Sequence, residues 1–414
     1  MRLGDIANDA ATPYGKPLDG VRVLALEQMQ ALPYATQMLA RLGAEVIKVE
    51  HPIDGEMARP SAPFVRDPQG RVLGATFLRN NLDKRSIGID LKKPEGRKLV
   101  LDLAVKFDVV AENFKAGTLA RMGLGYDNIA AVNPRAIYLS ISGFGNTVAT
   151  PYDSWPAFAA VAEAMSGMYE FKRAEGQLPV VSPFGALGDT TSGLFAVIGV
   201  LAALRHREQT GLGQYVDIAM YDAMVSMADI VPNYYSMGIN SGASLALIMD
   251  GFRASDGYFV VQCGRLFQFE RLAEVVGHPD WIGDERLQAP GQWREQMDAV
   301  LRPGIEEWAA QRTKRECCEV LAAAGVAAGP CNSPADVVGD PHVAARNMLV
   351  EIPRPNGDGD PVLVPGNPVK LSRVAEGPET RMPWVGEHTE AILRAELGLS
   401  DDQLADLRAS GAIV

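Results

Sequence analysis

Val21-Arg-Val-Leu-Ala-Leu26 and Ala44-Glu-Val-Ile-Lys-Val-Glu50 are two short apolar runs that flank a helical pattern from Pro33 to Leu42, closed by Gly43. Runs of this length and composition predict buried strands, and the segment between them predicts a helix. A strand, a helix and a second strand of this kind form a unit whose two strands are parallel. This stretch therefore predicts a parallel sheet with helices on both faces.

The same alternation continues for another hundred residues. A helix is predicted from Pro94 to Phe107, and strands are predicted at Asp108-Val-Val-Ala-Glu-Asn113 and Ala136-Ile-Tyr-Leu-Ser-Ile141. Ligands bind such sheets at the carboxyl ends of the strands. The turn after the first strand reads Glu27-Gln-Met-Gln30, without the GxGxxG of a dinucleotide site, so this Rossmann-like half is not expected to bind NAD or FAD.

Three parts of the chain are predicted from the order of these patterns. Helical stretches fill much of 157–230, the mixed segment 232–250 is a candidate crossing segment, and Gly257-Tyr-Phe-Val-Val-Gln262 opens a second unit. A hairpin-like stretch follows at 349–371. We expect an α/β fold with residues 1–231 as a large Rossmann-like domain, 232–334 as a smaller α+β domain, and 335–414 as a return to the large one.

Composition narrows the class of protein. The chain has 414 residues, is 47% hydrophobic and carries a net charge of −12, which argues against binding to nucleic acid or to an anionic membrane. Its four cysteines have no metal-like spacing, so no metal is expected and a reduced, cytoplasmic protein fits best. Residues 1–20 show no signal peptide. The apolar run Leu194–Leu204 is shorter than the ~20 residues of a membrane span and predicts a core helix.

Phe184-Gly-Ala-Leu-Gly-Asp189-Thr-Thr-Ser-Gly193 stands directly before that run. It places Asp189 at the start of an apolar helix, after a turn that contains glycine. An aspartate before Thr-Thr-Ser is a preferred helix N-cap. It could equally be a nucleophile that the surrounding loop shields from water, and the local pattern leaves both interpretations open.

Motifs spread over almost the whole chain resemble the class III coenzyme A transferases, the family of formyl-CoA:oxalate and carnitine CoA-transferases, also called CaiB/BaiF. They follow in family order from residue 17: Pro17-Leu-Asp-Gly-Val-Arg-Val-Leu24, Gln30-Ala31, Leu42-Gly-Ala-Glu-Val-Ile-Lys-Val-Glu50, Asn81-Leu-Asp-Lys-Arg-Ser-Ile87, Asp90-Leu-Lys-Lys-Pro-Glu-Gly96, Glu112-Asn-Phe114, Arg121-Met-Gly123, Ala164-Met-Ser-Gly167, Leu187-Gly-Asp189, Thr210-Gly-Leu-Gly-Gln214, Met220-Tyr-Asp-Ala223, Gly325-Val-Ala-Ala-Gly-Pro330 and Gly386-Glu-His-Thr389.

The resemblance implies a Rossmann-like domain built from both ends of the chain, a smaller middle domain, and two identical subunits interlocked like chain links. It implies transfer of CoA between carboxylic acids, with CoA thioesters as substrates and no prosthetic group or metal. Asp189 is the implied catalytic residue. The residues implied to bind CoA are Gln30, Ala31, Ile89, Lys92, Asn113, Phe114 and Arg121.

Chemistry gives these residues roles. An enzyme carboxylate splits the exchange into covalent steps. The attacking carboxylate must be ionised, and the ordinary pKa of about 3.9 allows Asp189 to be ionised at pH 7. Gln30 and the turn Gly185–Gly188 could donate to the oxyanions. Lys92 and Arg121 could meet phosphates, and Phe114 could lie against adenine. Each also has a structural alternative. Lys92 could be a solvated lysine, Arg121 could form a surface ion pair, and Phe114 could be a core aromatic residue. Gln30 could only stabilise the turn after the first strand.

Several departures from the family pattern bear on the substrate. His51 stands where well-known relatives carry a CoA-contacting Arg, and Phe158-Ala159 stands where many carry Tyr-Asp or Tyr-Glu. Asn240-Ser-Gly-Ala-Ser-Leu245 is a poor match for the four-glycine lid of the formyl-CoA type. We therefore expect an acid larger than oxalate, with succinyl-CoA or a similar donor. Alternatives are an α-methylacyl-CoA racemase, whose His-Asp pair would fall on Phe158 and Ala159, and a non-catalytic acyl-CoA-binding protein.

Overall fold

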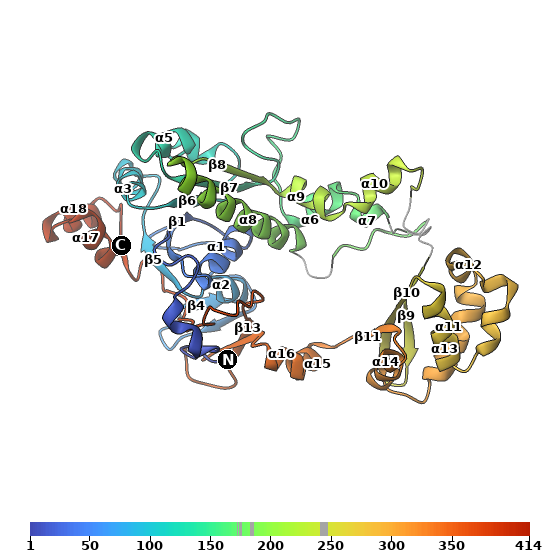
Figure 1. Cartoon of the computed structure of the whole chain (residues 1–414). Helices are drawn as coiled ribbons and strands as arrows, with labels where there is room; N and C mark the ends of the chain where they lie inside the picture. The colour runs from blue at the N-terminus through green and yellow to red at the C-terminus, as the bar shows by residue number, and fades with distance from the viewer. Residues whose placement is uncertain (172, 174–175, 183–185, 241–246) are drawn as a thin grey trace. The chain divides into compact units, whose positions relative to one another are not determined.

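A computed structural model of the chain describes residues 1–171, 173, 176–182, 186–240 and 247–414. It divides into two compact units (Figure 1). The first joins Met1–Asn233 to Ala344–Val414, and the second is Tyr234–Val343. Both ends of the chain therefore belong to the first unit.

The first unit is built on a six-stranded sheet in which every neighbouring pair of strands is parallel, as predicted. The strand order is β5-β2-β1-β6-β7-β8, with bounds β5 (Lys84–Gly88), β2 (Glu45–Glu50), β1 (Arg22–Leu26), β6 (Val109–Glu112), β7 (Ile137–Ser142) and β8 (Tyr215–Ala219). The order runs outward in one direction from β1 and in the other from β6. The carboxyl ends of β1 and β6 thus flank the switch point at which sheets of this kind bind ligands.

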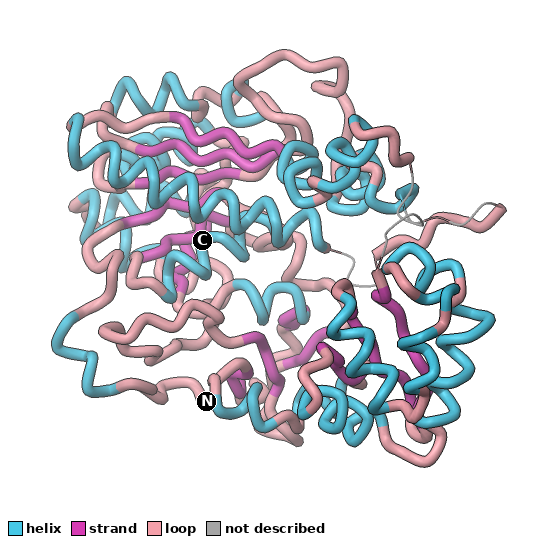
Figure 2. Tube along the Cα trace, turned by 45° about the vertical axis from the view of Figure 1, so that its right-hand side comes forward, coloured by secondary structure: helices cyan, strands magenta, loops and turns pink. Residues whose placement is uncertain are grey.

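Helices cover both faces of this sheet (Figures 1 and 2). Val23 and Ala25 of β1 pack toward α1 (Ala31–Arg41) and α8 (Leu187–Thr210). Leu24 and Leu26 point to the other face, which is covered by α3 (Pro94–Ala104), α5 (Tyr126–Val132), α17 (Thr389–Leu397) and α18 (Asp401–Ala409). Strands buried on both faces read as continuous apolar runs, which is why the sequence revealed β1 so clearly.

Smaller elements complete the first unit. They are η1 (Asp9–Tyr14), the antiparallel pairs β3 (Phe64–Arg66) with β4 (Val72–Gly74) and β12 (Leu349–Ile352) with β13 (Val362–Pro365), and the helices α2 (Ala75–Asn80), α4 (Thr118–Arg121), α6 (Ala159–Met165), α7 (Met168–Phe171) and α9 (Met220–Met227). The β12–β13 pair confirms the predicted hairpin. The helix α10 (Ile230–Ser236) lies at the boundary between the two units.

α8 is less buried than the sequence predicted. It is long and apolar enough to span a membrane, and 44% of its most apolar window is buried inside the protein. One side packs in the core, whereas Leu194, Ile198 and Leu201 on the other side are 47%, 60% and 38% exposed. The description of α8 as a core helix is therefore correct for one side only.

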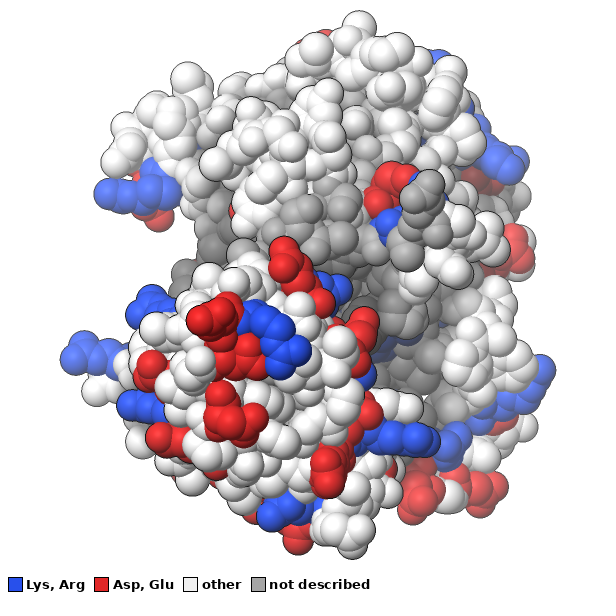
Figure 3. Space-filling view, turned by 90° about the vertical axis from the view of Figure 1, so that its right-hand side faces the viewer, with Lys and Arg blue, Asp and Glu red and all other residues white. Residues whose placement is uncertain are grey.

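The second unit combines a small sheet with helices. The antiparallel order β11-β10-β9 comprises β11 (Ala327–Pro330), β10 (Gly257–Cys263) and β9 (Ile248–Ala254), and the main helices are α11 (Leu266–Val275), α12 (Pro290–Glu295), α13 (Arg302–Ala309) and α14 (Lys314–Ala323). The rings of Trp293 and Phe269 stack in its core, 4.5 Å apart. β9 occupies the end of the segment expected to be a crossing. Acidic and basic side chains are interspersed on the surface in Figure 3.

Candidate active site

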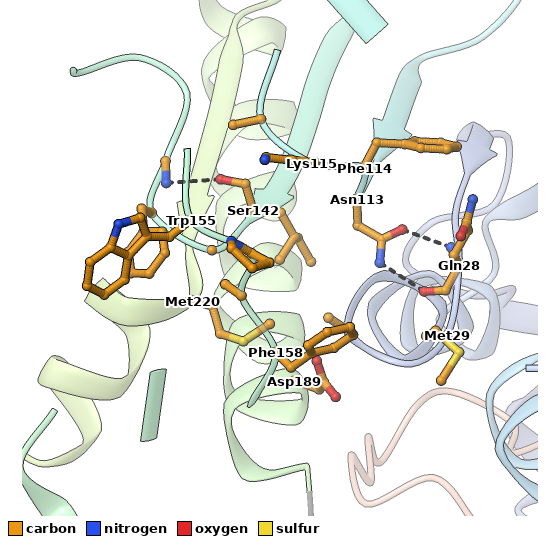
Figure 4. Close-up of a pocket in the computed structure, with 18 of the residues that line it drawn as sticks. Gln28, Met29, Asn113, Phe114, Lys115, Ser142, Trp155, Phe158, Asp189 and Met220 are labelled. Carbon is orange, nitrogen blue, oxygen red and sulfur yellow. Dashed lines mark hydrogen bonds between the residues drawn. The ribbon is translucent and has the colours of Figure 1, made fainter. Parts of the chain in front are cut away.

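Two turns meet at the switch point, one after β1 and one after β6. The Gln28 N–H donates to Asn113 Oδ1 at 2.8 Å, and Asn113 Nδ2 donates back to the Gln28 carbonyl at 2.9 Å (Figure 4). The Asn113 side chain therefore fastens the two strand ends together, a structural task that the family resemblance did not indicate.

The turn after β1 presents Gln30 at the first turn of α1. Met29 adopts a left-handed conformation with φ of 61°, which is unfavourable for a residue with a side chain. Its N–H donates to Glu56 Oε2 at 3.0 Å, and this bond helps to hold the turn. Gln30 is thereby the residue directly before α1, and it lines the pocket at the switch point.

Asp189 lies beside that turn because α8 crosses α1 at close range. A Cβ atom added at Gly193 would lie 2.8 Å from Tyr34 Cδ1 and 2.9 Å from the Ala31 carbonyl oxygen, so only glycine allows this approach. Asp189 stands one helical turn earlier. It lines a pocket of about 280 Å³ together with four of the predicted CoA-binding residues, Gln30, Ala31, Asn113 and Phe114 (Figure 4).

Asp189 is not the N-cap of α8. The helix begins at Leu187 and its N-cap is Ala186, so Asp189 is the third helical residue and makes no capping bond. The Gly188 N–H at this helix end donates instead to Glu163 Oε1 of α6 at 2.9 Å. A helix end needs such an acceptor, and this one takes up the Gly188 N–H that was expected to stabilise oxyanions. Gly185, the other end of that turn, lies outside the described residues.

The surroundings of Asp189 raise its pKa to about 6, well above the ordinary value that the sequence suggested. Burial is the main cause, and the negative charge of Glu163 adds to it. The positive charge of Arg79 acts in the opposite direction. At pH 7 most of the protein still carries an ionised Asp189, which is a stronger base than an ordinary carboxylate.

A second pocket of about 200 Å³ adjoins the first, because Gln28 and Phe114 line both. Ile89, Lys92 and His51 line it. Arg121 is absent from the lining of both pockets and donates to Thr118 Oγ1 at 3.1 Å on the surface.

Phe158 and Ala159 differ in how they meet the site. Phe158 is 68% exposed and lines the larger pocket, close to Asp189 in Figure 4. Ala159 is buried, and a Cβ added at Gly188 would lie 3.0 Å from its Cα. The start of α8 therefore packs directly on the backbone of α6. The lid segment expected at 240–245 falls almost wholly outside the described residues.

Sequence reasoning missed two charged residues, Glu163 and Arg79. Glu163 is fully buried and accepts hydrogen bonds from the Gly188 N–H and from the Tyr169 hydroxyl. The signal was a single carboxylate in the otherwise uncharged helix Ala159–Met165. Arg79 lies on the six-residue helix α2 and donates to Gln30 Oε1 at 2.6 Å. No local pattern indicates that contact.

Among the described residues no cluster suited to a metal ion occurs.

Comparison with known proteins decides the family. The family described as CoA-transferase family III matches residues 18–389. The chain belongs to this family. It is 35% identical, over 96% of its length and 98% of the relative, to the succinyl-CoA–L-malate CoA-transferase beta subunit of Chloroflexus aurantiacus. It is 36% identical to the succinyl-CoA:mesaconate CoA-transferase of Haloarcula hispanica, covering 91% of this chain and 95% of the relative.

A solved structure agrees with this membership. A CaiB/BaiF family protein from Brucella suis superposes with a TM-score of 0.79 and 35% identity, over 92% of this chain and 100% of the other. The formyl-CoA:oxalate CoA-transferase of a Bradyrhizobium species is 32% identical over 96% of this chain and 97% of its own. The family III protein described here is therefore an enzyme that transfers CoA from an acyl-CoA to a carboxylate.

Proposed function

We propose that the transfer passes through covalent intermediates on Asp189, an anhydride with each acid in turn and a thioester with CoA between them. The observation that carries this proposal is the state of the Asp189 carboxylate. It lines the larger pocket beside Gln30, and no described group donates a hydrogen bond to it or forms an ion pair with it. Such a carboxylate is free to attack, whereas a paired one would first have to lose its partner.

The proposed steps conserve charge without any net gain or loss of a proton. An Asp189 oxygen attacks the thioester carbonyl carbon, the C–S bond breaks, and CoA thiolate leaves an aspartyl–acyl anhydride. The thiolate attacks the aspartyl carbonyl, releasing the donor acid and leaving an aspartyl-CoA thioester. The acceptor carboxylate then attacks that thioester, and the released thiolate takes the acceptor acyl group, which restores Asp189.

Each of these steps passes through an oxyanion that needs an aimed donor. Gln30 supports this role because it lines the pocket and, within the described residues, its Nε2 donates to no other acceptor. The thioester carbonyl would point toward Gln30 while its carbon faces Asp189.

Coenzyme A is proposed to run from the smaller pocket to the larger one. Lys92 would meet a phosphate in the smaller pocket, and Ile89 and Phe114 would contact the adenine end. The pantetheine arm would pass Phe114 and Ala31 toward Asp189, with Asn113 acting through the turn that it holds. Arg121, exposed at the end of α4, would reach the phosphates only from the surface.

The acceptor is proposed to be a dicarboxylic acid larger than oxalate, with succinyl-CoA or a similar donor. The pocket volume of about 280 Å³ leaves room for such an acid, and Phe158 and Met220 make the wall near Asp189 less polar than a Tyr-Asp pair would. Relatives named for malate and mesaconate support this choice. Comparison of kcat/KM for oxalate, succinate, malate, itaconate and mesaconate tests it, and a tenfold preference for formyl-CoA with oxalate would contradict it.

We further propose that two identical chains interlock in a reducing cytoplasm. The exposed Leu194, Ile198 and Leu201 form one stripe of α8, spaced as residues on a single helical side. A stripe of this kind is stabilised when a second subunit covers it. Light scattering at micromolar concentration should give twice the chain mass, and a stable monomer would contradict the dimer. The unpaired cysteines Cys263, Cys317 and Cys318 fit the compartment.

The covalent mechanism is tested by trapping. Incubation with acyl-CoA and then with hydroxylamine or borohydride should modify Asp189 alone, as read by peptide mass spectrometry. The Asp189→Asn variant should show no modification while still binding CoA. Modification at another carboxylate, with Asp189 left intact, would contradict the assignment.

A further inference from the structure

Arg79 lies behind Gln30 in a position that two elements fix. Its carbonyl oxygen accepts from Gln37 Nε2 of α1 at 2.8 Å, and Gln37 Oε1 accepts from the Leu82 N–H at 2.8 Å. These two bonds attach the chain around the end of α2 to the helix that Gln30 precedes. The backbone at Arg79 is therefore held beside α1 independently of the guanidinium.

The contact with Gln30 determines how the amide is oriented. Arg79 Nη2 donates to Gln30 Oε1 at 2.6 Å. A guanidinium has donors and no acceptor, so only the oxygen of the Gln30 amide can face it. The Gln30 NH₂ must then face away from Arg79, where it is available to the pocket that Gln30 lines.

Arg79 also differs from the buried cations of the described residues. Arg41, Lys48, Arg59 and Lys84 each form an ion pair with a buried carboxylate. Arg79 is half-buried and forms no ion pair with any described residue. Burial lowers its pKa. The hydrogen bond of Arg79 goes to the neutral amide of Gln30 and not to a carboxylate, which indicates a role at the active-site turn.

We propose that Arg79 is a positioning residue for CoA transfer, which orients the Gln30 NH₂ toward the thioester oxygen. This inference rests on the nucleophilic role proposed for Asp189. The charged groups of the described residues that act on Asp189 are Arg79 from α2 and Glu163 from α6. Lys115 and Asp153 also line the pocket.

Arg79→Met removes the hydrogen bond to Gln30 and the positive charge. We expect kcat to fall about 10²-fold, the size of effect seen when one oxyanion donor is lost, with a smaller change in KM for acyl-CoA. The acid limb of the kcat profile should move to higher pH, because Asp189 loses its positive neighbour. Arg79→Lys retains the charge, so its acid limb should stay close to that of the unchanged enzyme while kcat still falls.

A double-mutant cycle with Gln30→Ala separates positioning from a general loss of structure. In the Gln30→Ala background, Arg79→Met should lower kcat at high pH by less than about threefold, since no amide is left to orient. A loss as large as in the unchanged background would overturn the positioning role.

Two further measurements keep the outcome clear. Thermal melting and CoA binding of each variant report whether the fold and the nucleotide end are intact, and Arg79→Lys provides the comparison if Arg79→Met is unstable. Retained turnover in Asp189→Asn would refute the proposed function itself. Loss of turnover in Asp189→Asn together with near-normal kinetics in Arg79→Met would refute this inference alone.

Discussion

Glu27 is fully buried and Asp189 is half-buried in the same unit, and their surroundings are opposite. Glu27 directly follows β1 and accepts from Lys84 Nζ at 2.7 Å and Thr36 Oγ1 at 2.6 Å, with Lys48 Nζ 3.4 Å away. Burial alone would raise the pKa of Glu27, but the two lysines outweigh it and hold that pKa below its ordinary value. Asp189 has no such partners, and its pKa is raised to about 6.

The difference shows how one domain uses buried charge in two ways. A carboxylate in contact with ammonium groups is stabilised as an anion, which fixes the sheet and makes the group a weak base. A carboxylate with only distant charges keeps its oxygen atoms free and its basicity high, which suits a nucleophile. The reactivity proposed for Asp189 therefore depends on the lack of a directly contacting partner among the described residues.

Removing the unpaired carboxylate should have the largest effect. We expect Asp189→Asn to lower kcat at least about 10⁴-fold, because the covalent route is lost. Steady-state kinetics at pH 8 measures this, and CoA binding by calorimetry checks that the nucleotide end is intact. A variant that retains a tenth of the activity would refute the nucleophile assignment.

Breaking the ion pairs around Glu27 should affect the stability of the fold rather than catalysis. Lys84→Met leaves Glu27 buried with one ammonium group fewer, and we expect a loss of about 3–5 kcal/mol in the free energy of unfolding. Lys98→Met is the matched control, since Lys98 pairs with Asp102 on the surface of α3, and it should cost less than about 1 kcal/mol. Urea denaturation compares them, and equal losses would contradict the role given to the buried cluster.

Asp189→Asn should also make the protein more stable at neutral and alkaline pH. The folded-state pKa of about 6 lies above the unfolded value, so ionisation of Asp189 destabilises the fold as pH rises through 6. We expect a gain of about 1–3 kcal/mol at pH 8 that disappears near pH 3, below the ordinary pKa of about 3.9, where Asp189 is protonated in both states. Thermal melts at both pH values test this, and a variant less stable than the parent at pH 8 would contradict it.

The smallest effect is expected from Glu163→Gln. This change removes a negative neighbour of Asp189 and leaves an oxygen for the Gly188 N–H. The pKa of Asp189 should therefore fall, and the acid limb of kcat, expected near pH 6 in the parent, should move to lower pH. Glu170→Gln, an exposed carboxylate paired with Arg173, is the control and should leave the limb unchanged. A shift to higher pH would show that Glu163 acts in another way.

The sheet shows where sequence prediction succeeds. β1, β2, β6 and β7 were predicted because their residues are apolar and buried on both faces. β5 was not, since Lys84-Arg85-Ser86 do not read as a buried strand. Lys84 and Ser86 are buried only because Glu27 and Glu50 on neighbouring elements accept their hydrogen bonds. That compensation is invisible in a single segment.

The sequence by itself determined the parallel sheet, the family and the candidate residues Gln30 and Asp189, because apolar periodicity and ordered motifs are local properties of the chain. Only the tertiary structure decided that Asp189 lies inside the first turn of α8, with Glu163 on the neighbouring Gly188 N–H and Arg79 on Gln30. Hydrogen bonds and charge effects act across a few ångströms of space, and α2, α6 and α8 are brought within that range only by packing around the sheet.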